Sequence, residues 1–375
     1  MEVKQVYTVV NGALKETLGE TAVLNEDLSN IVDMGNAIFN ASATHIISKN
    51  LVNRIGRLVF EAKKYAGRAP SVYMDSWEYG SVKQKITFEL NTATENESWE
   101  LVNGTSYDPN IFTEPKADVK YFNSRTTFEV PISITEEMIK QSFTSAAEMN
   151  ALVSGIFTYI DNTMTIATDN LVMRTINNMI AETVHDNNAN RVVKLLTAYN
   201  AAHGTELTKD NALENPDFAR YLALTLELYA NRLSTMSTLF NIGGKQRFTP
   251  DDKRHLVMLD RVKASTDIYL QSGVFHNELT ALPTAETVPY WQGSGTNYSM
   301  AECSKIDVKT SAGNTVSQDG IIAIMFDRSA LGVSCMNKRT TTNYNGKAEF
   351  TNYWFKQDAM YFNDTNENAV VFLLA

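Results

Sequence analysis

Residues 321–326, Ile321-Ile322-Ala323-Ile324-Met325-Phe326, form a short apolar run rich in β-branched residues, which is typical of a strand buried in a sheet. Turn-forming residues at Asn345-Gly346 and 364–368 separate the strand-like segments that follow it, because Asn, Asp and Gly tolerate the backbone of tight reversals. Those segments are 332–336, 347–362 and 370–374. The chain is therefore predicted to end inside a sheet, with 370–374 as a strand required for folding.

The composition is that of a folded protein of one large domain or two to three smaller ones. The chain has 375 residues, of which 43% are hydrophobic and 20% charged, a balance that separates it from disordered chains. Its formal net charge of -10 and its pI of about 5.1 argue against a protein whose whole surface binds nucleic acid. A generic DNA-binding protein is thereby disfavoured.

Nothing in the sequence indicates export or membrane insertion. Cys303 and Cys335 lie far apart, which favours two core thiols in a reducing cytoplasm over a disulfide framework. The first residues, 1–5, lack the basic and apolar regions of a signal peptide, and no run reaches the ~18 apolar residues of a membrane span. We therefore expect a soluble cytoplasmic chain without a membrane partner.

The N-terminal part has two different characters. Residues 1–44 are mildly acidic and weakly patterned, and are predicted to form an arm lying on another surface. Residues 45–70 are predicted to form an amphipathic helix whose apolar stripe is Ile47, Leu51, Ile55, Val59 and Ala62. This helix is strongly basic, with six bases, a single acid at Glu61 and a net charge of +5. Its bases are Lys49, Arg54, Arg57, Lys63, Lys64 and Arg68.

Residues 71–133 predict an extended two-stranded loop. Two alternating runs, 82–90 and 119–132, flank a polar insert rich in turn residues. Because two strands cannot bury both of their faces, such a hairpin needs a neighbour, and a second copy of the chain is an economical candidate. The segment carries five bases and ten acids, a net charge of -5 opposite in sign to that of the preceding helix.

A long helix is predicted to follow. Ser133 and Glu136 have capping-box spacing, and either Ser133 or Thr135 can cap the helix. No proline occurs between Pro131 and Pro216, so residues 135–185 are predicted to form one helix or two helices joined by a bend. Residues 190–345 are mixed, with predicted helices at 218–236 and 266–282 and a buried strand at 254–259.

Motifs of catalysis are weak. The five histidines are scattered, and Gly243-Gly244-Lys245 lacks the flanking residues of a phosphate-binding loop. The best acidic cluster, Asp251-Asp252 with His255 and Asp260, could bind a hard cation, but its turn-like composition makes a simple turn the favoured interpretation. No catalytic residue, cofactor or metal site is therefore predicted.

Several segments resemble the major capsid proteins of tailed double-stranded DNA bacteriophages. The likeness is carried by the C-terminal segments FDRSALG, YNGKAEFTNYWFK and DAMYFND, at 326–332, 344–356 and 358–364, and by the passage from extended loop to helix at 118–139. LVNRIG at 51–56 is also similar to capsid proteins of short-tailed phages of Gram-positive bacteria. The resemblance covers the chain from end to end.

The resemblance implies an α+β capsid fold with six segments. They are the N-terminal arm (1–44), the basic amphipathic helix (45–70), the extended loop or β-tongue (71–133), the spine helix of a peripheral domain (134–189), an axial domain (190–345) and the C-terminal strands of the peripheral domain (346–375). Hexamers and pentamers of the chain would form an icosahedral head shell around packaged double-stranded DNA, with no catalytic step. The implied location is the virion, after assembly in the host bacterial cytoplasm.

The implied partners are other copies of the chain, a portal protein and, since no long charged N-terminal coiled coil is present, a separate scaffolding protein. Packaged DNA would be contacted weakly and without sequence specificity. The six bases of residues 45–70 would then supply an inner surface for DNA or an acidic scaffold, the alternative being ion pairs between subunits. Three other classes remain open: an encapsulin-like compartment holding a cargo enzyme, an enzyme acting through the Asp251 cluster, and a monomeric binding module.

Overall fold

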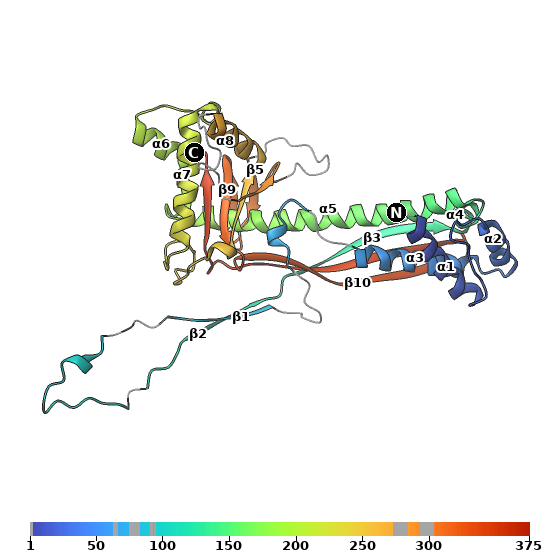
Figure 1. Ribbon diagram of the computed structural model, residues 1–375, viewed down its shortest axis with the longest axis horizontal. Coiled ribbons are helices and arrows are strands. Elements are labelled where there is room, and N and C mark those ends of the chain that lie inside the picture. The colour runs from blue at the N-terminus through green and yellow to red at the C-terminus, as the bar shows by residue number, and fades with distance from the viewer. Residues whose placement is uncertain are drawn as a thin grey trace. The chain divides into compact units, whose positions relative to one another are not determined.

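The computed structural model describes residues 3–62, 67–74, 83–90, 93, 95–110, 112–272, 284–292 and 304–375. The chain folds into two compact units, and each is assembled from segments that are distant in sequence (Figure 1). The first unit comprises Met1–Glu78, Arg125–Val172 and Val333–Met360. The second comprises Tyr79–Ser124, Met173–Gly332 and Tyr361–Ala375.

Helices α1 to α3 form one end of the core of the first unit. Their bounds are α1 Val3–Leu18, α2 Ile31–Asn40 and α3 Thr44–Ala62. The predicted stripe of α3 is confirmed at Ile47, Leu51 and Ile55, which are buried, while the side chains of Val59 and Ala62 lie outside the described part. Residues 1–44 differ from the expected weakly patterned arm, because α1 and α2 pack their apolar sides into the same core as α3.

A three-stranded antiparallel sheet completes that core, in the order β10–β11–β3. Its strands are β3 Arg125–Thr135, β10 Leu331–Asn345 and β11 Phe350–Asn363. Alternate residues of β3 and β11 point to the helices, so that Phe355 lies opposite Val130 in the ladder and both are buried. The other face carries polar cross-strand pairs such as Thr127 with Asp358, as expected of a sheet with one solvated face.

The predicted long helix is present as two helices. The short helix α4, Glu136–Ser142, begins where the Thr135 hydroxyl accepts a hydrogen bond from the amide of Met138. The helix α5 then runs from Ala146 to Asp186, and its 41 residues correspond to about 60 Å at a rise of about 1.5 Å per residue. The prediction for 135–185 is therefore confirmed in its two-helix form, with Thr135 as the cap.

The second unit is organised around a five-stranded sheet in the order β4–β12–β9–β5–β6. Its strands are β4 Val192–Lys194, β5 Arg254–Leu259, β6 Glu286–Val288, β9 Ile321–Asp327 and β12 Ala369–Leu373. Every residue of β9 and β12 is buried, which explains why these strands are apolar throughout except for Asp327 at the end of β9. The predictions of strands at 321–326, 254–259 and 370–374 are confirmed.

Helices α6 Leu195–His203, α7 Pro216–Leu233 and α8 Asp260–Ser272 pack around this sheet. The predicted helix at 218–236 corresponds to α7, whereas α8 begins six residues before the predicted start at Thr266, and residues 273–283 lie outside the described part. A separate pair, β7 Ile306–Lys309 and β8 Thr315–Gln318, forms a small hairpin. Single 3₁₀ turns occur at η1 Pro70–Val72, η2 Glu97–Trp99, η3 Ala212–Glu214 and η4 Asp251–Lys253.

The structure also divides the chain differently from the expected segments. The alternating run 119–132 forms parts of two strands, because β2 (Ala117–Phe122) pairs with β1 (Lys83–Phe88) while β3 pairs with β11. The expected C-terminal segment 346–375 is shared by both units, since β12 hydrogen-bonds to β9 and β4 of the five-stranded sheet. Residues 333–345 were expected at the end of the axial domain (190–345). They belong instead to the first unit, where β10 pairs with β11.

Candidate functional site

The β1–β2 hairpin has its two faces reversed relative to an ordinary surface hairpin. One face is uncharged and exposed, and consists of Gln84, Ile86, Phe88, Ala117, Val119 and Tyr121. The other face is partly buried against the hairpin's own unit, and consists of Lys83, Lys85, Thr87, Asp118, Lys120 and Phe122. A hairpin that serves only its own fold places apolar side chains inward and charges outward, so the reversed pattern indicates a partner for the outer face.

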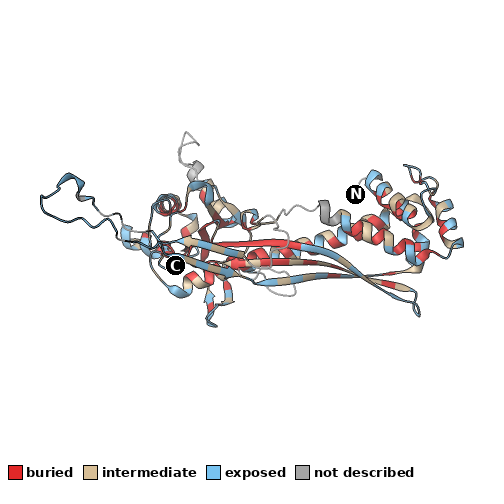
Figure 2. Cartoon of the chain, turned by 90° about the horizontal axis from the view of Figure 1, so that it is seen from below, coloured by how far each residue is buried: buried red, intermediate tan, exposed pale blue. Residues whose placement is uncertain are grey.

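The exposed apolar character continues into the loop that joins the two strands. Figure 2 shows this loop almost entirely in the colour of exposed residues. Phe88 and Tyr121 of the outer face are 63% and 65% exposed, and Trp99 and Phe112 in the loop are 95% and 84% exposed. Large aromatic side chains are enriched in protein interfaces and gain most from burial there. The hairpin and its loop therefore have the composition of a docking element.

The inner face is held by two carboxylates of the turn between β11 and β12. The Asp364 carboxylate accepts hydrogen bonds from Lys85 Nζ at 2.7 Å and from Lys120 Nζ at 3.0 Å, with only 2% of its side chain exposed. Glu367 Oε1 lies 2.7 Å from Lys85 Nζ and also accepts from Arg247 Nε at 3.1 Å. We call Lys85, Lys120, Asp364 and Glu367 the hairpin anchor.

The electrostatics of the hairpin anchor follow from its burial. Burial alone would raise the pKa of Asp364, but the ion pairs with Lys85 and Lys120 outweigh it and hold that pKa below its usual value. Burial beside Lys85 lowers the pKa of Lys83 to about 8, although Asp364 opposes the shift. The Lys83 ammonium lies 3.6 Å from the centre of the Phe362 ring, a cation–π contact on the same face of the hairpin.

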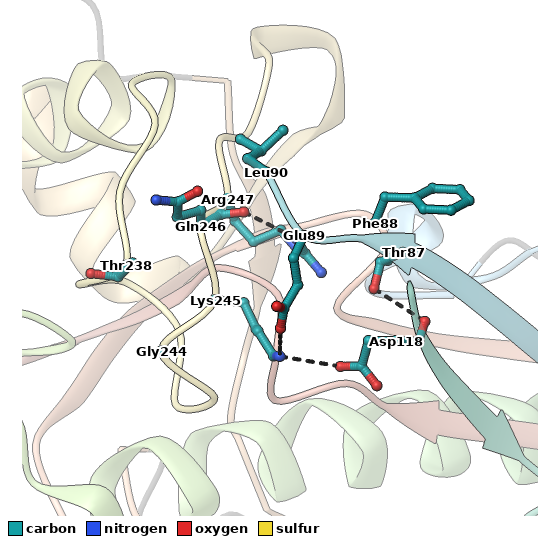
Figure 3. A pocket seen from close by; sticks show the side chains of 10 residues that line it. All are labelled: Thr87, Phe88, Glu89, Leu90, Asp118, Thr238, Gly244, Lys245, Gln246 and Arg247. Atoms are coloured by element: carbon teal, nitrogen blue, oxygen red, sulfur yellow. Dashed lines mark hydrogen bonds and ion pairs between the residues drawn. The ribbon is translucent and has the colours of Figure 1, made fainter. Parts of the chain in front are cut away.

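A second set of ion pairs ties the hairpin to the loop at 238–247 (Figure 3). Lys245 Nζ lies between Glu89 Oε1, at 2.8 Å, and Asp118 Oδ2, at 3.5 Å, so that one lysine bridges both arms of the hairpin. The hydrogen bond raises the pKa of Lys245 and lowers that of Glu89. These groups and Phe88 line a pocket of about 300 Å³.

The turn that carries the anchor is itself fixed by buried polar contacts. Asn368 Nδ2 donates to Thr249 Oγ1 at 3.2 Å, and the amide of Asp364 donates to the carbonyl of Ala330 at 2.6 Å. Gly243 is required beside this turn, because a Cβ atom there would come within 2.0 Å of Asn366 Oδ1. The sequence alone indicates only a turn at 364–368. The signal that could have indicated the hairpin anchor is the pair of acids in this turn together with lysines at alternate positions of the hairpin strands.

The six bases predicted for an inner surface do not form one group. Arg54 pairs with Glu16 of α1 at 2.5 Å, and Arg68 pairs with Asp169 of α5 at 2.5 Å, so these two charges are neutralised within the first unit. Lys49 and Arg57 are exposed on α3, on the same face with Asn53 between them, and make no ion pair within the described residues. Lys63 and Lys64 lie outside the described residues.

The acidic cluster at Asp251 is a turn, as the composition favoured. Residues 251–253 form the 3₁₀ turn η4, and Asp251 pairs with Arg254. Burial lowers the pKa of His255, with a further contribution from Arg328. Across the described ranges no group of three or more acidic, His or Cys side chains is placed to hold a metal ion, and no helix in them is long and apolar enough to cross a membrane.

Comparison with known proteins identifies the family. The model of the Phi29-like phage major capsid protein family matches residues 8–373, so the chain belongs to that family. A search of curated proteins finds no match. The resemblance to tailed-phage capsid proteins is thus confirmed at the level of the family.

Solved structures share the fold at low sequence identity. The capsid structure of Staphylococcus phage Andhra is 8% identical, with a TM-score of 0.53 over 84% of this chain and 86% of that chain. A structure described as the head fiber and inner core protein gp22 of native bacteriophage P68 is 9% identical, with a TM-score of 0.53 over 82% and 85% of the two chains. The predicted α+β capsid fold is confirmed.

The protein is a structural protein of a phage head shell, and hence a component of the virion. The family match favours this function over the encapsulin-like compartment. It also assigns the chain to a family of shell proteins, which assemble from many copies of themselves.

Proposed function

We propose that copies of this chain assemble through the β1–β2 hairpin into pentamers and hexamers of an icosahedral shell that encloses double-stranded DNA. The reversed polarity of the hairpin is the observation that carries this proposal. Its charged face is neutralised by the same chain, while Ile86, Phe88 and Tyr121 face outward. A second copy that covers the outer face would bury apolar surface without desolvating a charge.

The roles of the two units follow from the same proposal. The first unit, with the part of α5 up to Val172 and the β10–β11–β3 sheet, would act as the peripheral domain, and the five-stranded sheet with α6 to α8 as the axial domain around five-fold and six-fold centres. Shell closure would use a separate scaffolding protein and a portal protein in the cytoplasm of the host bacterium. The chain would perform no catalytic step.

We further propose that Lys49 and Arg57 belong to a positive surface that faces DNA or an acidic scaffold. Their support is that both are exposed on one face of α3 without an ion pair in the described part of the chain. Lys63 and Lys64 extend the same basic segment in sequence. Arg54 and Arg68 contribute less to such a surface, because Glu16 and Asp169 neutralise them.

A photo-crosslinking amino acid at Phe88 tests the hairpin contact in assembled particles. Particles built from an equal mixture of ¹⁴N-labelled and ¹⁵N-labelled chains separate crosslinks within one copy from crosslinks between copies. We expect crosslinked peptides of mixed isotope label, which only two copies can give. If every crosslink joins two ¹⁴N peptides or two ¹⁵N peptides and none joins one of each, the assignment of the outer face as a contact between copies is contradicted.

A further inference from the structure

The charged side chains on the inner face of the hairpin do not by themselves stabilise the pairing of β1 with β2. Lys85 of β1 and Lys120 of β2 are direct partners in the ladder, and like charges directly opposite each other destabilise a strand pair. Lys83 adds a third ammonium on the same face. A two-stranded sheet is marginal in water even without such repulsion.

The counter-charges come from the other end of the chain. Asp364 lies 279 positions from Lys85 and 244 positions from Lys120 in sequence. Its turn is closed by backbone bonds at both ends, from the Asp364 amide to the Ala330 carbonyl at 2.6 Å and from the Ala369 amide to the Phe240 carbonyl at 2.9 Å. The second of these bonds is made by the first residue of β12, so the turn closes as the last strand enters its sheet.

We propose that Asp364 is a positioning residue that makes ordering of the β1–β2 hairpin conditional on closure of the turn before β12. Without the turn, three ammonium groups repel one another on one face of a two-stranded sheet, whose single carboxylate, Asp118, is paired with Lys245. With the turn closed, the Asp364 carboxylate lies between the two opposed lysines and fixes both strands. An incompletely folded chain then presents no ordered hairpin to other copies, a consequence that rests on the proposed function of the hairpin.

Hydrogen exchange of the full-length chain as unassembled subunits tests the proposal, with each segment followed by mass spectrometry. The variant Asp364→Asn keeps the shape of the side chain and removes its charge. We expect amides of β1 and β2 to exchange at least tenfold faster, while β9 and β12 keep their protection within twofold. Asp319→Asn is the matched control, because Asp319 forms an exposed pair with Lys209 in the same unit and should leave the hairpin unchanged.

A rescue variant separates positioning from a general loss of folding. Adding Lys120→Gln to Asp364→Asn removes the opposed lysine pair, so we expect it to restore part of the hairpin protection. The proposal is overturned if Asp364→Asn leaves β1 and β2 unchanged, or if β1, β2, β9 and β12 lose protection together and Lys120→Gln restores none of it. Faster hairpin exchange with normal shells would support the positioning role and contradict the proposed assembly role of the hairpin.

Discussion

Lys85 and Lys120 lie directly opposite each other in the β1–β2 ladder, and the buried carboxylate of Asp364 accepts a hydrogen bond from each. A single anionic side chain thus joins the two strands of the hairpin to the turn before the last strand of the chain. The arrangement directs the charged face of the hairpin toward its own unit. The uncharged face, with Ile86 and Tyr121, is left for contacts outside it.

Lys83 should make the stability of the folded chain increase with pH. Its pKa of about 8 in the folded chain is below the usual value of 10.5, so the folded state disfavours the charged form, and stability should rise as the pH increases from 7 toward 10. Lys83→Met keeps the apolar stem over Phe362 and removes the charge. Urea unfolding at pH 7 and pH 9.5 should show the wild type gaining stability relative to Lys83→Met.

The gain should stay below about 1.4 kcal/mol per pH unit, the limit for one proton, because the Lys83 ammonium is only partly buried. Lys209→Met serves as the control, since Lys209 lies in an exposed pair with Asp319. A stability difference between wild type and Lys83→Met that is the same at both pH values would contradict the assignment.

Two glycines in the helices of the first unit should respond oppositely to alanine. A Cβ atom at Gly56 would meet Phe355 Cε1 at 2.7 Å, so Gly56→Ala should overpack the contact between α3 and the sheet and cost about 1–3 kcal/mol. Gly155 of α5 faces open space, so Gly155→Ala should stabilise the helix by about 0.5–1 kcal/mol. The unfolding temperatures of both variants test these two expectations. If Gly56→Ala and Gly155→Ala shift the unfolding temperature equally in the same direction, α3 does not approach Phe355 closely.

The last strand should be indispensable for folding. Val370, Val371, Phe372, Leu373 and Leu374 are all buried, and at about 1.5–3 kcal/mol per side chain they contribute on the order of 10 kcal/mol, comparable to the net stability of a domain. Removing the last six residues should therefore yield aggregated protein. A soluble truncated chain with an unchanged thermal transition would contradict the place of β12 in the core.

Strong local patterns allowed the sheet strands and the long helix to be predicted. The apolar runs of β9 and β12 and the proline-free stretch of α5 each specify one kind of element. The helices α1 and α2 were missed, because their apolar residues become a recognisable face only against α3. The split of 119–132 into two strands was also missed, since pairing partners distant in sequence decide which sheet a strand joins.

The candidate site was predictable in part. The hairpin, its acidic loop and the basic character of 45–70 follow from composition and alternation. The hairpin anchor does not, because Lys85 and Asp364 are brought together only by the complete fold. For the same reason the sequence could not distinguish the exposed Lys49 and Arg57 from Arg54, which is paired with Glu16.

The basic surface of α3 can be tested by its effect on particle contents. Changing Lys49 and Arg57 to Gln should permit shells but lower their DNA filling or retention of scaffold, because two positive charges that make no ion pair among the described residues are lost. Arg54→Gln is the matched control, which should lower stability by about 0.5–1 kcal/mol through its pair with Glu16 and leave filling unchanged. The change of Lys63 and Lys64 to Gln is expected to act as the first variant does.

The DNA content of purified particles, measured by the ratio of absorbance at 260 nm and 280 nm, gives the result. Failure of the Lys49 and Arg57 variant to form shells would favour ion pairs between subunits as the role of these bases. Normal shells with normal DNA content would exclude both roles for them.

The most direct measurement of the central claim is electron microscopy of a chain that lacks residues 92–115, which include the exposed Trp99 and Phe112. A second variant with those residues replaced by an equally long Gly-Ser segment keeps the reach of the hairpin without its side chains. Circular dichroism and thermal unfolding establish that both variants fold. Closed shells from the wild type and only soluble folded subunits from both variants are the predicted result, and normal closed shells from the deletion would contradict assembly through the hairpin.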